Sequence, residues 1–456
     1  MKFTEKIFSI LRNSLPSPLS IALLLTVLVF VITLFTITPA TNQSSLSATF
    51  LAWENGLWSN NGLVFLVQMM LMLILGHVIA LTQQVNAIIN RLVQFTKNPQ
   101  QMVWVVCFAT LLVSWVNWGL GLVFGAILCR KIGEHAELHQ LKINYALIGT
   151  AGYAGLMFWH GGLSGSALIK VSEQGHLASL MENSSHDLPA FIGFNETAFS
   201  IGNIIICGLV LLIIPMTLRF FAQNNLAVPQ GLITKEKQEV AIEKSPYLAE
   251  RLDSQPKFGL LIGIALLVGI TGKFISSEAG WAFISPNTIN ITLLGLAFLL
   301  HGSIRNFSHA IERAISDGTG ILIQFPLYFG IMGLMSGGNL IEHVSSFFVS
   351  ISSAETFPIW AFFSAGLVNL FVPSGGGQWM IQGPIIIEAC QQLSVPLSKG
   401  ILALAYGDQI TNMLQPFWAL PLLGITKLKA QDLFPYTFVL FIVGTVIYLF
   451  GLMFLL

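Results

Sequence analysis

Nine long apolar runs divide this chain, and they constrain its fold more than any other feature. A helix needs about 20 mostly apolar residues to cross the hydrocarbon core of a bilayer. Only 9% of the 456 residues are charged, against about 25% in a soluble domain, so much of the surface must face lipid. The sequence therefore predicts an all-α polytopic membrane protein. Its predicted spans are 19–38, 62–81, 141–168, 196–218, 257–276, 286–304, 318–336, 399–425 and 433–456.

Two further apolar segments, 101–129 and 357–389, are long and have polar or helix-breaking residues in the middle. Each is either one kinked span or a re-entrant hairpin, which enters and leaves the membrane on the same side. The interrupting residues are Asn117 and Gly119 in the first segment, and Asn369, Pro373 and Gly375-Gly376-Gly377 in the second.

The distribution of lysine and arginine favours the two hairpins. Both residue types are enriched in cytoplasmic loops. With two hairpins and a cytoplasmic N-terminus, 18 of the 21 Lys and Arg residues fall inside, and only Lys170, Lys273 and Lys399 fall outside. If 101–129 were a full crossing, the basic residues after it would move outside. The sequence thus predicts about nine crossings of a cytoplasmic membrane, with the C-terminus on the outer side.

The order of elements repeats along the chain. Each half contains two spans, a hairpin, a glycine-rich broken helix and a final span. Five crossings separate equivalent elements, and an odd number inverts the second repeat, so the hairpin tips meet near the midplane as in secondary transporters. The predicted division is 1–218 for the first repeat (hairpin 101–129, broken helix 141–168), 219–256 for a cytoplasmic connector, 257–276 for a linking span, and 286–456 for the second repeat (hairpin 357–389, broken helix 399–425).

Four polar, glycine-rich segments interrupt the hairpins and the broken helices. Free backbone groups in hydrocarbon are costly, so such breaks persist where they line a cavity or bind something. Broken helix ends offer N–H groups to a carboxylate, and carbonyl and side-chain oxygens to Na⁺. The predicted substrate-binding residues are Asn117, Gly119, His160, Gly161, Gly162, Ser164, Asn369, Ser374, Gly375, Gly376, Gly377, Gln378, Thr411, Asn412 and Gln415.

These segments also have a structural interpretation. The glycines could serve tight helix crossings, and Asn117 and Asn369 could cap helices at the hairpin tips. Capping is compatible with binding, so the two asparagines remain candidates for ion coupling and for a Na⁺ site at the hairpin tips.

Five ionisable residues fall within or beside the apolar segments, where such residues are usually functional. Asp408 is the best candidate for coupling to a proton or cation, with a structural hydrogen bond as the alternative. His160 could contact a carboxylate or relay a proton, or bond a nearby carbonyl. We expect His77 and His301 to pack and Glu388 to lie near water.

Four tryptophans flank the polar segments: Trp118, Trp159, Trp379 and Trp418. They could wall a small apolar pocket for an alkyl chain, and packing within a helix bundle explains them equally well.

The sequence carries no pattern of an enzyme. Nucleophile elbows, metal-spaced His/Cys sets and phosphate-binding loops are missing, so we expect no catalytic activity and no cofactor. The four cysteines are scattered without metal or redox spacing. A formal net charge of zero gives no reason to expect a nucleic-acid partner.

At its polar segments the chain resembles the bacterial short-chain fatty acid transporter family, the acetoacetate/butyrate type, of the ion-transporter superfamily. The resemblance implies a scaffold part and a mobile transport part, an elevator-type motion, a homodimer and a place in the inner membrane of a bacterium. The matching stretches are 119–126, 159–167, 372–384 and 408–424.

The sequence and the resemblance together predict a secondary transporter of short-chain monocarboxylates driven by H⁺ or Na⁺. The absence of lysine and arginine from the membrane interior argues against a second carboxylate on the substrate. Two alternatives remain: a transporter of a dicarboxylate or an amino-acid-like anion, and a passive channel or a non-transporting scaffold.

Overall fold

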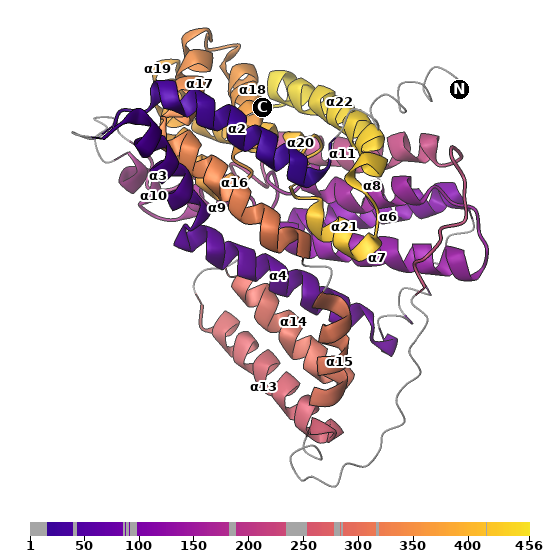
Figure 1. Cartoon of the computed structure of the whole chain (residues 1–456). Coiled ribbons are helices and arrows are strands. Elements are labelled where there is room, and N and C mark those ends of the chain that lie inside the picture. Colours follow the sequence, from indigo (N-terminus) through magenta and orange to yellow (C-terminus); the bar gives the residue numbers. More distant parts are fainter. Residues whose placement is uncertain are drawn as a thin grey trace.

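A computed structural model describes residues 16–39, 43–84, 87, 91, 98–181, 188–233, 253–277, 283, 286–315, 319–415 and 417–456. Within these ranges every named element is a helix, which confirms the predicted all-α fold (Figure 1). Six helical stretches in this part of the chain are long and apolar enough to cross a membrane. They are Pro18–Thr36, Ser45–Ile79, Pro99–Val116, Ile201–Phe221, Pro256–Ile275 and Ala430–Phe454.

The first half of the chain pairs long helices with a helix hairpin and a broken helix. Its elements are α2 (Pro18–Thr36), α3 (Ser45–Leu57), α4 (Asn60–Ala80), α6 (Pro99–Val116), α7 (Trp118–Leu138), α8 (Tyr145–Tyr153), the 3₁₀ helix η1 (Ala154–Met157), α9 (Ser166–Ser172), α10 (His176–Leu180) and α11 (Ile201–Phe221).

The second half contains the same kinds of element. They are α13 (Pro256–Ile275), α14 (Pro286–His301), α15 (Ile304–Ala314), α16 (Thr319–Gly337), α17 (Leu340–Ser350), α18 (Phe357–Phe371), α19 (Gly375–Gln392), α20 (Leu397–Thr411), α21 (Leu420–Thr426) and α22 (Ala430–Phe454).

The segment 101–129 falls within two helices that only Asn117 separates. Asn117 has an extended backbone, with φ of −153°, and its side chain accepts a hydrogen bond from the N–H of Leu120 at 2.9 Å. This is N-cap geometry, which ends α6 and starts α7 at once.

The segment 357–389 breaks over three residues, between α18 and α19. Pro373 has no N–H to donate, and the hydroxyl of Ser374 accepts from the N–H of Gly377 at 3.2 Å as the cap of α19. The two hairpins therefore differ in their tips: one residue in the first and three in the second.

Four of the described helices, α3, α10, α15 and α17, are absent from the list of predicted spans. They have only 13, 5, 11 and 11 residues. A search for apolar runs of about 20 residues overlooks helices of this length. The strong amphipathicity of α15, which has Arg305, His309 and Arg313, makes it still harder to detect.

Half of the predicted connector 219–256 lies outside the described residues, but its first part is held firmly. Residues 231–233 donate three backbone N–H groups to the carboxylate of Glu137 at 2.7–2.8 Å. Slight burial opposes the effect, but these three hydrogen bonds hold the pKa of Glu137 below its usual value. Arg130 adds a bond to the carbonyl of Leu232.

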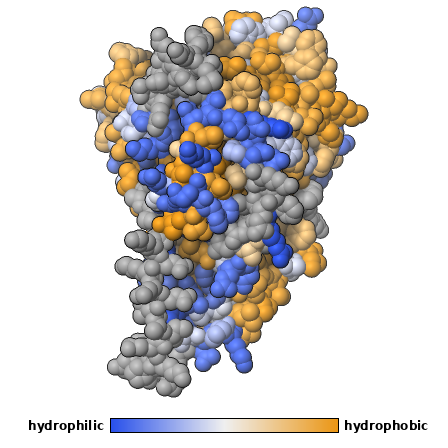
Figure 2. All heavy atoms as spheres, turned by 90° about the vertical axis from the view of Figure 1, so that its right-hand side faces the viewer, coloured by the Kyte–Doolittle hydropathy of each residue, from blue (hydrophilic) through white to orange (hydrophobic). Residues whose placement is uncertain are grey.

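The helices form a main body and a wedge that projects from it. The wedge consists of α13, α14 and α15, and it packs on α4 through its own small apolar core (Figure 1). Only 11% of the most apolar stretch of α13 is buried inside the protein, as expected for a helix that faces lipid. Hydrophilic residues gather on the face that Figure 2 shows, with apolar surface beside them.

Candidate functional site

A buried pair of ionisable side chains lies at the centre of the site. Nδ1 of His160, in the loop between η1 and α9, contacts Oδ2 of Asp408 on α20. The two side chains are 0% and 2% exposed. Nε2 of the same ring accepts the N–H of Ala167 at 3.2 Å. A backbone N–H can only donate, so the ring proton sits on Nδ1 and faces the carboxylate.

The sequence named both residues of this pair but did not predict that they meet. They are 248 positions apart, and each belongs to a different broken helix. The pair places a hydrogen bond between two titratable side chains away from water.

The loop that carries His160 is a break in a helix, and other helices complete its hydrogen bonds. Nδ2 of Asn412 donates to the carbonyl of Leu156 at 2.9 Å. The hydroxyl of Tyr448, on α22, donates to the carbonyl of Met157 at 2.5 Å. A buried carbonyl left without a partner costs about 1–3 kcal/mol, so these contacts stabilise the break.

The next turn of the loop is held from two sides. Oε1 of Gln409 accepts the N–H of His160 at 2.8 Å and the N–H of Gly161 at 3.3 Å. From the other side, Nδ2 of Asn203 on α11 donates to the carbonyl of Gly161 at 2.9 Å. His160 is therefore fixed relative to both α20 and α11.

Asn369 joins the second hairpin to the break after α20. Its Nδ2 lies 2.7 Å from the carbonyl of Asp408, 3.0 Å from Oγ1 of Thr411 and 3.0 Å from Oδ1 of Asn412. Nε2 of Gln415 donates to the carbonyl of Asn369 at 3.2 Å. Four predicted site residues thus meet around the backbone of Asp408.

Some amide oxygens at these residues have no protein donor. Within the described part of the chain, Oδ1 of Asn369, Oε1 of Gln415 and Oε1 of Gln378 are buried and accept no hydrogen bond. Such oxygens suit a hard cation, or a water that a ligand displaces. Nε2 of Gln378 is engaged with the carbonyl of Ala365 and so ties α19 to α18.

The N-terminus of α19 touches the His160 loop. A Cβ on Gly375 would lie 2.9 Å from Cε1 of His160 and 2.9 Å from Cη2 of Trp159, so only glycine permits this approach. At Gly376 the nearest atom would be Cβ of Ser166, at 3.9 Å. The first N–H groups of an α-helix lack partners within it and carry a partial positive charge.

The tip of the first hairpin packs against the same loop at Ser164. The hydroxyl of Ser164 accepts the N–H of Trp118 at 3.0 Å, and the N–H of Leu163 donates to the carbonyl of Trp115 at 2.8 Å. Asn117 acts as a helix cap here. No hydrogen bond joins Asn117 to Asp408 in the described structure.

Two of the predicted binding glycines lie at close packing contacts. A Cβ on Gly119 would come within 2.7 Å of Sδ of Met72 on α4. A Cβ on Gly162 would overlap the carbonyl of Trp115. Both positions therefore show the tight packing that the structural interpretation anticipated.

Aromatic rings surround one side of the His160 loop. Trp159 stacks on His160, with ring centroids 4.4 Å apart. Trp118 lies 6.0 Å from Trp159 and 5.1 Å from Trp418, and Phe65 of α4 lies 6.0 Å from Trp418. Together these side chains present an apolar wall.

Trp379, the fourth predicted tryptophan, makes a different contact. Its Nε1 donates to Nε2 of His176 on α10 at 3.0 Å. The contact links the second hairpin to the short helices that follow the His160 loop.

The remaining candidate ionisable residues lie elsewhere. His301 makes a hydrogen bond to the carbonyl of Val78 at 2.9 Å, within the contact between α14 and α4. Glu388 is exposed and accepts a hydrogen bond from Gln392. No group of three or more His, Cys, Asp or Glu side chains that could hold a metal occurs among the described residues.

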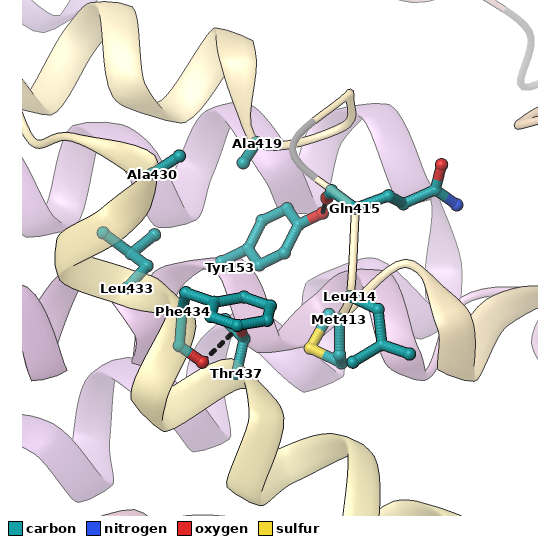
Figure 3. A pocket seen from close by; sticks show the side chains of 9 residues that line it. All are labelled: Tyr153, Met413, Leu414, Gln415, Ala419, Ala430, Leu433, Phe434 and Thr437. Carbon is teal, nitrogen blue, oxygen red and sulfur yellow. Dashed lines mark hydrogen bonds between the residues drawn. The ribbon is translucent and has the colours of Figure 1, made fainter. Parts of the chain in front are cut away.

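A small cavity lies behind the break that follows α20 (Figure 3). Its volume of about 20 Å³ is close to that needed for one water molecule. The hydroxyl of Tyr153 donates beside it to the carbonyl of Asn412 at 2.8 Å. The lining residues are Tyr153, Met413, Leu414, Gln415, Ala419, Ala430, Leu433, Phe434 and Thr437.

Sequence reasoning missed the side chains that support the loop: Asn203, Tyr406, Gln409 and Tyr448. Asn203 and Tyr448 are isolated polar residues in the long apolar helices α11 and α22. An amide side chain buried in a membrane helix needs hydrogen-bond partners. The asparagine within an apolar run was therefore the sequence signal that could have identified Asn203.

The apolar helices, the buried pair of His160 and Asp408 and the polar breaks are features of a membrane transport protein. The chain belongs to the short-chain fatty acid transporter family, whose model matches residues 1–455. The family resemblance of the polar segments is thereby confirmed.

Two relatives match over almost the whole chain. A proposed short-chain fatty acid transporter of Escherichia coli (strain K12) is 35% identical, with 96% of both chains covered. A protein of the same description from Haemophilus influenzae is 32% identical, with 97% of this chain and 96% of the relative covered. The YdaH transporter of Alcanivorax borkumensis is a distant structural neighbour, with 16% identity, a TM-score of 0.44, and coverage of 96% of this chain and 98% of that one.

Proposed function

We propose that this protein is a secondary active transporter that moves short-chain monocarboxylates, such as acetoacetate and butyrate, across the inner membrane of a bacterium. The single observation that carries the proposal is the buried contact between His160 and Asp408 beside the N-terminus of α19. It supplies a place for a proton next to helix N–H groups that favour a carboxylate.

The surroundings support a substrate with one carboxylate and a short chain. Arg130 is the one buried lysine or arginine among the described residues, and it is engaged with Glu134 and with the carbonyl of Ile425. A second carboxylate therefore has no cationic partner. The wall of Trp118, Trp159 and Trp418 offers apolar contacts to an alkyl group.

The buried pair of His160 and Asp408 favours coupling of transport to a proton. Coupling to Na⁺ is the second candidate, because Oδ1 of Asn369 and Oε1 of Gln415 are buried without donors in the part of the chain described. Both oxygens are neutral amide oxygens of the kind that a hard cation accepts.

The proposed arrangement in the membrane has about nine crossings, with 101–129 and 357–389 as hairpins that enter from opposite sides. In this arrangement the two inverted repeats enclose the site, and an elevator-type movement within a homodimer carries it between the two surfaces. The wedge of α13–α15 with α4 is the natural scaffold, because it has an apolar core of its own.

Uptake of labelled butyrate and acetoacetate into proteoliposomes tests the proposal, with the pH gradient and the Na⁺ gradient imposed separately. We expect the pH gradient to drive accumulation. Accumulation under the Na⁺ gradient alone would favour the second candidate, and no accumulation under either would refute the transporter.

Two controls separate the alternative functions. Unlabelled dicarboxylates and amino acids in excess should compete poorly with butyrate. Counterflow that saturates with substrate would exclude a passive channel.

A further inference from the structure

Asn203 is a polar residue in the first turn of the otherwise apolar helix α11, and its side chain is fully buried. Its Nδ2 donates to the carbonyl of Gly161 at 2.9 Å and to that of Ala198 at 2.7 Å. Its Oδ1 accepts the hydroxyl of Tyr406 at 2.5 Å. One amide therefore joins α11, the His160 loop and α20.

These hydrogen bonds act on the residue next to His160. Gln409 holds the loop by the N–H groups of His160 and Gly161, and Asn203 holds it by the carbonyl of Gly161. The two contacts come from different helices and act on the two peptide units that flank the Cα of Gly161. A change at Gly161 would be transmitted to the adjacent His160, whose ring contacts Asp408.

Tyr406 supports Asn203, because its hydroxyl donates to Oδ1 of the amide. It is fully buried and stacks on Tyr448, with ring centroids 4.7 Å apart, and Tyr448 in turn bonds the carbonyl of Met157. The loop is thus held on both sides of His160 by one connected set of side chains.

We infer that Asn203 is a positioning residue for proton coupling: it acts through Gly161 to keep Nδ1 of His160 on Asp408. The inference rests on the proposed function, since it concerns the same pair. Asn203 makes no direct contact with the ring in this arrangement, so its loss changes the alignment of the pair and leaves the other groups of the site in place.

Asn203→Ala tests the inference in proteoliposomes. We expect uptake driven by a pH gradient to fall about tenfold, the effect of one lost buried hydrogen bond to the loop, with the KM for butyrate little changed and the pH profile altered. Tyr406→Phe, which keeps the ring stacking, should act in the same direction but less. Thr217→Val, at a half-buried threonine whose hydroxyl donates to the carbonyl of Ile213 in the same helix, is the matched control and should behave as wild type.

Combination with His160→Ala separates positioning from general stability. If Asn203 acts through His160, the double variant loses no more than His160→Ala alone. Additive losses, or a pH profile of Asn203→Ala identical to that of wild type, would overturn the inference.

A second measurement keeps the test independent of transport. In detergent, Asn203→Ala should alter how the unfolding temperature depends on pH when His160 is present, and should not when His160 is alanine. If wild type accumulates no substrate, the proposed function fails, while this unfolding measurement still supports or refutes the positioning role. If Asn203→Ala does not fold, Tyr406→Phe is measured in the same way.

Discussion

At the scale of single residues, the site has one defined proton position, on Nδ1 of His160. Nε2 of His160 is occupied by the N–H of Ala167, so the imidazole has only Nδ1 with which to exchange a proton with Asp408. The hydrogen of the pair therefore lies between Nδ1 of His160 and Oδ2 of Asp408. For the proposed coupling to protons, Asp408 is the residue to replace first.

Asp408→Asn should abolish uptake driven by a pH gradient while substrate exchange persists, because the amide keeps the shape and loses the titratable group. The check is to compare gradient-driven uptake with counterflow in the same proteoliposomes. Glu388→Gln, at an exposed carboxylate, serves as control and should retain both. Normal gradient-driven uptake by Asp408→Asn would show that the proton travels elsewhere.

Gly375→Ala should reduce transport strongly, by roughly tenfold or more, because the new Cβ would lie 2.9 Å from the His160 ring and from Trp159. Gly376→Ala meets its first neighbour only at 3.9 Å and should lose much less. The measurement is the initial rate of butyrate uptake by each variant. Equal losses would mean that the space between α19 and His160 does not limit transport.

At the scale of elements, α10 and α19 are joined by a bond that protonation can break. Burial, aided by the nearby charge of Lys170 and opposed by Glu173, holds the pKa of His176 below its usual 6.5. Nε2 must be unprotonated to accept the indole N–H of Trp379. The contact is therefore complete above pH 6.5 and is lost as the pH falls below that value.

His176→Gln should weaken the pH dependence of stability, because glutamine offers an acceptor that does not titrate. The unfolding temperature in detergent, followed from about pH 8 to about pH 5, measures this. Wild type should lose stability below pH 6.5 more steeply than the variant. Parallel curves would contradict the proposed role of this bond.

At the scale of the whole molecule, the prediction concerns topology. Reporter fusions should place the N-terminus and the loop after α7 on the cytoplasmic side, and the C-terminus on the outer side. The reason is the distribution of Lys and Arg. Most of these residues fall on the cytoplasmic side only if both interrupted segments are re-entrant hairpins. A cytoplasmic C-terminus would mean that one of the hairpins crosses the membrane completely.

The helices of this molecule could be predicted largely from apolar length, and the breaks from Asn117, Pro373 and the glycines. Helix α15 could not, because its polar face hides it from a search for apolar runs. Asp408 and His160 stood out as charged or titratable groups in apolar surroundings. Their contact depends on the packing of elements 248 residues apart, which no local pattern encodes.

The supports of the site were the least predictable part. Asn203 and Tyr448 each occupy one position in a helix that is otherwise suited to lipid, so the sequence signals a need for partners but does not say which groups they bond. Their role appears only when the carbonyls of Gly161 and Met157 are found to need donors.

This sharing of hydrogen bonds also constrains how such a chain can evolve. Side chains from α11, α20 and α22 supply hydrogen-bond partners for the backbone of the His160 loop. Mutations on those helices therefore change the hydrogen bonding of the loop. A lineage that loses the amide at position 203 must gain another donor for the carbonyl at 161 or reshape the turn. Substitutions at these distant positions are therefore expected to arise together, and the loop with its three helices is inherited as one unit.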